Sequence, residues 1–136
     1  MMKTTTFLLV RPGLRSVLVP ALVMFAVGCD GTTSVPEPAP EDAARATLES
    51  ALGAWQKGES VAAMKAASQS VTVADPKWEK GQKLTKYEVL GKGEPSGAER
   101  VFQVKLWLSN GGKESQESVA YRVGTQPIRT VFRALF

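Results

Sequence analysis

Few side chains in this sequence of 136 residues could do chemistry, because it has one Cys and no His. Without His, the chain lacks the usual general base at neutral pH and the commonest metal ligand. A single Cys excludes an internal disulfide, a CxxC redox pair and a thiolate zinc site. We therefore expect no catalytic residue, no metal and no cofactor. The position of the one Cys, residue 29, becomes the feature to explain.

Two tyrosines remain as candidates for acid–base chemistry in an interior pocket. Tyr87 and Tyr121 fall on the inward side of their predicted strands, where a buried Tyr most often gives its hydroxyl to a backbone partner. Asp42 and Asp75 stand in no recognisable catalytic spacing. A pocket that uses Tyr or Asp as the acid or base stays open as an alternative.

The segment before the Cys predicts export. Residues 1–28 contain three basic side chains and no acidic one, and an apolar stretch over residues 16–28 ends in small residues. This layout is typical of a secretory signal peptide. The stretch is too short to span a bilayer, and Pro20 interrupts it. Removal of 28 residues from 136 leaves 108, with 14 basic and 13 acidic side chains, so nucleic acid is not expected as a partner.

The end of this segment, Ala26-Val27-Gly28-Cys29, resembles the lipobox of bacterial lipoproteins. The resemblance implies that Cys29 receives a diacylglyceryl thioether and becomes the mature N-terminus, and two or three acyl chains suffice for stable anchoring. It also implies a protein of the cell envelope that is anchored to a membrane and faces the periplasm. By the same analogy Asp30 can favour the inner membrane, but the choice of membrane stays open. The alternative is a free buried Cys, although polar and small residues follow this one.

Residues 29–40 are predicted to form a lipidated Cys and a Pro-rich tether, and residues 41–136 a single domain. Pro36, Pro38 and Pro40 alternate with other residues, which favours an extended spacer. A first helix is expected from Glu41 to about Lys57, because its apolar residues recur at spacings of three and four. Ser60 is expected to cap a short second helix that runs to about residue 68.

After Lys83 the apolar residues alternate with period two, which predicts four strands that form an antiparallel meander. A two-residue turn at Gly111-Gly112 would pair Val104 with Val119 and Phe102 with Tyr121, whereas residues 91–97 and 124–127 are expected to be loops. The inward sets are Thr85, Tyr87 and Val89; Phe102, Val104, Leu106 and Leu108; Val119, Tyr121 and Val123; and Ile128, Thr130 and Phe132.

The predicted fold class is therefore α+β, with an N-terminal helix and a short second helix packed on a four-stranded antiparallel meander. This order resembles the cystatin-like and nuclear transport factor 2-like folds over roughly residues 41–136. Enzymes of the second class usually carry an Asp or His and a Tyr between helix and sheet. The resemblance therefore keeps open a small pocket enzyme that acts on a hydrophobic substrate.

The outward face of the sheet carries the candidate interaction patch Trp107, Lys105 and Arg122. The alternative is a solvated face on which Trp107 packs under a loop or under the second helix. Exposed aromatic and Arg side chains often anchor interfaces. We expect a non-enzymatic binding or scaffolding domain, with an envelope protein or a small hydrophobic ligand as its partner and with its oligomeric state open. The outward residues predicted by alternation are Lys86, Glu88, Gln103, Lys105, Trp107, Gln116, Arg122, Arg129 and Arg133.

Overall fold

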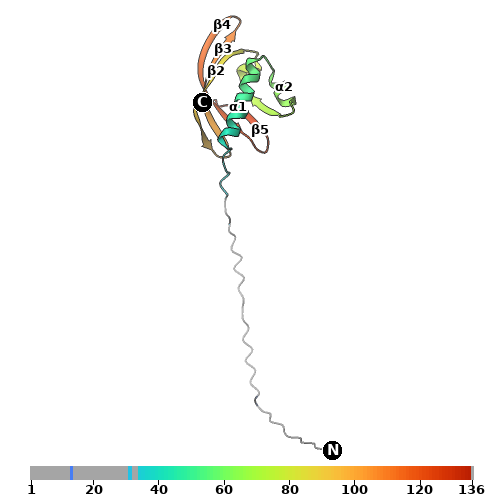
Figure 1. Cartoon of the computed structure of the whole chain (residues 1–136), viewed down its shortest axis with the longest axis vertical. Coiled ribbons are helices and arrows are strands. Elements are labelled where there is room, and N and C mark those ends of the chain that lie inside the picture. The colour runs from blue at the N-terminus through green and yellow to red at the C-terminus, as the bar shows by residue number, and fades with distance from the viewer. Residues whose placement is uncertain (1–12, 14–30, 32–33, 136) are drawn as a thin grey trace, which may run out of the picture. The chain divides into compact units, whose positions relative to one another are not determined.

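The computed structural model of the chain describes Gly13, Gly31 and residues 34–135. Apart from Gly13, the expected signal peptide lies outside the described residues, as does the expected lipid attachment residue Cys29. Among the described residues, no helix combines the length and apolar character needed to cross a membrane. These residues form an α+β fold with three helices and one five-stranded sheet (Figure 1).

The first helix, α1 (Glu41–Gln56), confirms the prediction closely. Leu48, Leu52 and Trp55 are buried on one side of the helix and face the sheet. Two acidic residues occupy the first turn, where carboxylates are favoured by the helix dipole. The chain leaves the helix through Gly58, whose φ of +86° suits a residue without a side chain.

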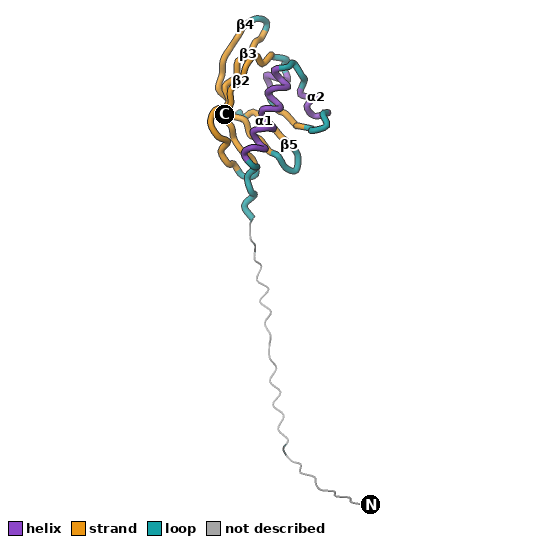
Figure 2. The backbone as a smooth tube through the Cα atoms, viewed as in Figure 1, coloured by secondary structure: helices purple, strands orange, loops and turns teal. Residues whose placement is uncertain are grey.

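The second helix, α2 (Val61–Ala66), is two residues shorter than expected. The Ser60 hydroxyl accepts a hydrogen bond from the Ala63 N–H at 3.1 Å, as the predicted cap requires. Met64 is buried in the core, and the half-buried Val61 packs against it. Figure 2 shows α1 and α2 on the same side of the long strands, and Trp78 of the third helix (Pro76–Glu79) stacks on Trp55 of α1. The opposite sheet face therefore carries no helix among the described residues.

The predicted four-stranded meander is wrong, because the sheet has a fifth strand and is mixed. The strand β1 (Val71–Ala74) pairs in parallel with β5 (Arg129–Arg133), and a third helix, α3 (Pro76–Glu79), follows it. The strand order is β1-β5-β4-β3-β2. A four-residue strand shows almost no period of its own, and a parallel partner more than fifty residues away leaves no local signal.

The hairpin that turns at Gly111-Gly112 confirms the predicted register. The strands β3 (Glu99–Asn110) and β4 (Lys113–Gly124) pair Val104 with Val119 and Phe102 with Tyr121. The turn residues Gly111 and Gly112 both have positive φ, as this type of tight turn requires.

The strand β2 (Lys83–Ser96) continues through residues 91–96, so the loop expected there is wrong. Its pairing with β3 shifts between Leu90 and Glu94, and Gly91 has a φ of +62° within that shift. An irregularity of this kind bends a strand without ending it. The bend brings β2 against α1, where the Arg45 guanidinium donates to the Gly91 carbonyl oxygen.

The inward set predicted for β5 is also wrong by one residue. Val131 is buried opposite Val123, Arg133 lies opposite Tyr121, and Ile128 is 61% exposed. The short segment has apolar residues in both phases of the alternation, so its own pattern is ambiguous. Pairing with β4 and β1 selects the phase. Thr130 is buried even so, and its hydroxyl oxygen accepts the Gly124 N–H at 3.2 Å.

Candidate functional site

The interior between α1 and the sheet is filled by apolar side chains. Leu48, Leu52, Leu106 and Leu108 are buried there, and Phe102 lies among them. The rings of Trp55 and Trp78 stack at a centroid distance of 5.2 Å with planes 3° apart. Five open hollows lie along the described part of the chain, and the residues that line these five do not include Asp75, Tyr87 or Tyr121.

Asp75 and Tyr121 form the most buried polar contact of the described residues. Asp75 is 0% exposed, and its Oδ2 accepts the Tyr121 hydroxyl at 2.5 Å. Its Oδ1 accepts the backbone N–H groups of Lys77 and Trp78 at 2.9 and 3.3 Å, which caps α3. The backbone partner expected for Tyr121 is therefore wrong. Burial and then the negative charge of Asp75 raise the pKa of Tyr121, so the hydroxyl keeps its proton and acts as the donor.

Two further charged residues extend this contact. Arg133 is directed inward, contrary to the predicted outward face, and its Nη1 lies 3.4 Å from both Asp75 carboxylate oxygens. Glu117 accepts Arg133 Nη2 and Lys77 Nζ, both at 2.6 Å. Burial raises the pKa of Glu117, but the hydrogen bonds and positive charges of its two partners outweigh burial, and the net pKa lies below the ordinary value.

Side-chain hydrogen bonds connect these residues into one network, whose members are Asp75, Tyr121, Arg133, Glu117 and Lys77. Two acids face two bases, so the charges compensate, and the arrangement joins α3, β4 and β5. Sequence reasoning missed it. The signal that could have found it was the Asp75-Pro76 pair, which marks a helix start, together with the inward phase of Tyr121.

The outer sheet face brings together two of the three residues predicted as an interaction patch. Trp107 is half-buried on β3, with Lys86 Nζ 4.6 Å and Lys105 Nζ 5.9 Å from its ring centroid. Lys86 lies directly opposite Trp107 on β2. These three residues are called the Trp107 patch below.

Arg122, the third predicted member, does not belong to this patch. It lies opposite Val101, six residues along β3 from Trp107, which corresponds to about 20 Å of strand. Its Nη2 is 2.6 Å from Glu99 Oε2, so its charge already has a partner.

The predicted tether is docked on the domain at its last residues. The Ala39 N–H donates to the Ala98 carbonyl oxygen at 3.1 Å, and the Ala39 carbonyl oxygen accepts Arg100 Nε. Arg100 also donates to Gly93 O at 2.9 Å. Ala39, within the range predicted as tether, is therefore held to the domain by its backbone groups.

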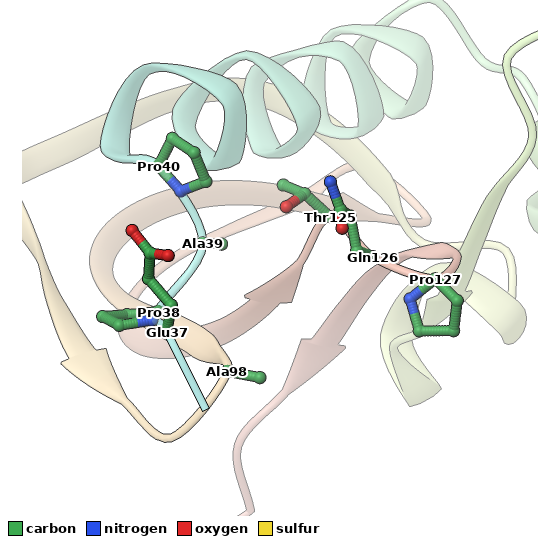
Figure 3. A pocket seen from close by; sticks show the side chains of 8 residues that line it. All are labelled: Glu37, Pro38, Ala39, Pro40, Ala98, Thr125, Gln126 and Pro127. Atoms are coloured by element: carbon green, nitrogen blue, oxygen red, sulfur yellow. The ribbon is translucent and has the colours of Figure 1, made fainter. Parts of the chain in front are cut away.

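An open hollow of about 490 Å³ lies where the tether meets the domain (Figure 3). The tether lines one part of this hollow and the loop between β4 and β5 lines another, and Glu37 supplies the one carboxylate among the described lining residues. The described lining holds no pair of groups arranged for acid–base chemistry. The lining residues are Glu37, Pro38, Ala39, Pro40, Ala98, Thr125, Gln126 and Pro127.

The tether contact and the Trp107 patch lie toward opposite ends of the sheet. Ala98 is in the turn between β2 and β3, whereas Trp107 lies near the Gly111-Gly112 turn at the other end of β3. Trp107 lies eight residue steps along β3 from Glu99, which corresponds to about 26 Å of strand.

Comparison of the chain with protein-family models, with curated proteins and with solved structures gives no match. Among the described residues, no group of three or more His, Cys, Asp or Glu side chains has the proximity needed to hold a metal ion.

Proposed function

We propose that this chain is a lipid-anchored protein of the bacterial cell envelope, whose domain faces the periplasm and holds a partner protein at the Trp107 patch. The observation that carries the proposal is a half-buried Trp that lies under two lysines, on a sheet face that carries no helix in the described part of the chain. A large aromatic side chain with neighbouring cations is a common anchor of protein interfaces.

The charges of the patch support a partner with an acidic surface. Lys86 and Lys105 take part in none of the ion pairs among the described residues. Their ammonium groups can therefore meet a partner's carboxylates without the loss of an existing pair. The same face offers the Trp107 ring as apolar contact area.

The packing of the interior favours a binding function over the alternative of a small pocket enzyme. The space between α1 and the sheet is occupied by Leu, Phe and Trp side chains, and Tyr121 and Asp75 are bonded to each other. The resemblance to cystatin-like and nuclear transport factor 2-like folds stays a prediction. A long α1 against long, bent hairpins supports it, and the parallel β1 departs from the meander on which it was based.

The anchor is tested by the change Cys29→Ser in a bacterium that processes lipoproteins. We expect loss of radioactive palmitate labelling and release of the protein from the membrane fraction. A matched control moves the only thiol five residues along the chain, as Cys29→Ser with Ser34→Cys. Labelling that persists in the first variant, or that returns in the second, would contradict the anchor.

The patch is tested with a photo-crosslinking amino acid at Gln116, which lies opposite Trp107 on β4. The control position is Arg122, on the same strand and the same face. We expect one adduct of defined mass from position 116 and none from position 122. Trp107→Ala, or Lys86→Gln with Lys105→Gln, should abolish it. Equal yields from both positions, or a yield that these changes leave unaltered, would refute the proposal.

A further inference from the structure

The end of the domain at which the tether joins carries an exposed apolar side chain between basic ones. Ile128 is 61% exposed, and it shares an open hollow of about 580 Å³ with Lys65 and Arg129. Thr125 and Pro127 line this hollow and also line the hollow that contains Glu37 to Pro40 (Figure 3). Ile128, Arg129 and Lys65 are called the tether-side surface below.

The charge of this surface is positive, because its two charged side chains, Lys65 and Arg129, are both basic. Arg129 donates to the neutral side chain of Gln69 at 2.6 Å, and neither Arg129 nor Lys65 joins an ion pair among the described residues. Glu37 is the one carboxylate among the residues that line the two hollows. An apolar side chain flanked by cations is suited to the headgroup region of an anionic bilayer.

Chain length places this surface near any membrane to which Cys29 is attached. Ten residue steps separate Cys29 from Ala39, where the chain is docked on the domain, and they span at most about 35 Å. The twelve residues of β3 alone extend over about 40 Å. The tether is thus shorter than the sheet is long, so the end that holds Ala39 stays closest to the anchor.

We propose that the tether-side surface rests on the anionic bilayer that holds the lipid anchor, with Ile128 at the boundary of headgroups and acyl chains and with Lys65 and Arg129 against lipid phosphates. This inference rests on the proposed lipid anchor at Cys29. Contacts this small would not retain a free protein, but a short tether keeps the local concentration of lipid high. The orientation that results directs the Trp107 patch away from the membrane, toward a partner in the periplasm.

The test uses the full chain, processed and purified from a bacterium, in vesicles of phosphatidylethanolamine with phosphatidylglycerol. A fluorescent probe on Gln126→Cys reports on the tether-side surface, and the same probe on Ser115→Cys near the opposite turn is the control. Lipids with a spin label in the acyl chain quench a probe that contacts the bilayer. We expect quenching at position 126 to exceed that at position 115 several-fold, and to fall in vesicles of neutral phosphatidylcholine.

Two variants separate the chemistry of the contact. Lys65→Gln with Arg129→Gln should lower quenching at position 126 in anionic vesicles to the level seen in neutral ones, since each cation near such a surface strengthens binding about fivefold. Ile128→Ser should weaken quenching in both kinds of vesicle. These side chains are exposed, so unchanged circular dichroism and thermal unfolding are the control for folding.

The outcomes distinguish this inference from the anchor on which it depends. Mass spectrometry that finds no acyl group on Cys29 would overturn the anchor and this inference together. An acylated protein that stays with the vesicles, but whose two probes are quenched equally, would overturn the inference alone. Quenching at position 126 that is the same in anionic and neutral vesicles would also overturn it.

Discussion

Replacement of Asp75 should destabilise the domain strongly, because its buried carboxylate contacts Tyr121 and Arg133, which are distant from it in the sequence. Its carboxylate accepts the Tyr121 hydroxyl and two backbone N–H groups and lies beside Arg133, at 0% exposure. Asp75→Asn keeps a side-chain oxygen for the helix cap and removes the negative charge. Asp75→Ala removes both.

The two variants should differ by a predictable amount. Loss of the charge weakens the Tyr121 hydrogen bond and leaves the inward-facing Arg133 with Glu117 alone, and a buried hydrogen bond to a charged group contributes about 1.5–3 kcal/mol. Loss of a helix cap adds about 1 kcal/mol. We therefore expect a loss of about 2–3 kcal/mol for Asp75→Asn and about 3–5 kcal/mol for Asp75→Ala.

The free energy of unfolding is measured by urea titration of residues 30–136, since every residue of the described core lies between Ala39 and Val131. Tryptophan fluorescence follows the stacked Trp55 and Trp78, and circular dichroism follows the sheet. Coincident transitions by the two probes justify two-state treatment. With a slope near 1 kcal/mol per molar urea, typical of small domains, Asp75→Asn should move the midpoint by about 2 M or more.

Asp42→Ala is the matched control, because Asp42 is an exposed acid in the first turn of α1. It should change stability by no more than about 0.5 kcal/mol. The reasoning is refuted if Asp75→Asn is as stable as the wild type, or if Asp75→Ala and Asp42→Ala behave alike. Equal losses for the two Asp75 variants would show that the cap contributes nothing beyond the charge.

Two more predictions concern acid sensitivity and close packing. The pKa of Glu117 is lowered in the folded state, so its contribution is present above the unfolded pKa and is lost as pH falls through the folded value. The urea midpoint should therefore drop between about pH 5 and pH 3, and Glu117→Gln should make this drop smaller. An equal drop in the variant would contradict the contribution of Glu117 to acid sensitivity. Gly93→Ala should lower the free energy of unfolding by about 1–3 kcal/mol, because the new Cβ would lie 2.5 Å from the Phe102 ring. Gly53→Ala within α1 should raise the free energy of unfolding by up to about 1 kcal/mol. A Gly93→Ala protein with an unchanged urea midpoint would show that Phe102 moves aside freely.

Local patterns in the sequence were enough to predict the elements that are stabilised by contacts between residues close together in the sequence. Helix α1 has an apolar stripe and a glycine after its end, and its prediction was confirmed to within a residue or so. The hairpin of β3 and β4 turns at Gly111-Gly112, and a two-residue turn at that place pairs Phe102 with Tyr121. This register is observed. Both signals lie within about twenty-five residues of chain.

The prediction for β5 failed because a distant partner decides its structure. The alternation in β5 is ambiguous, and its parallel neighbour β1 has four residues, so only their mutual pairing selects the inward phase. The same pairing turns Arg133 inward to meet Asp75 and Tyr121. A one-residue change of phase thus converts an expected surface arginine into part of a buried network.

The candidate site divides in the same way. The sequence by itself predicted an export segment followed by Cys29 and a tether, because that order depends on local composition. It also placed Trp107 and Lys105 on the outer face of the sheet, because that placement depends on the alternation of residues along one strand. Tertiary structure decided that Lys86 joins them and that Arg122 does not, because register across β2, β3 and β4 sets which side chains meet. It also decided that the tether docks at Ala39, since its hydrogen-bond partners Ala98 and Arg100 lie about sixty residues further along the chain.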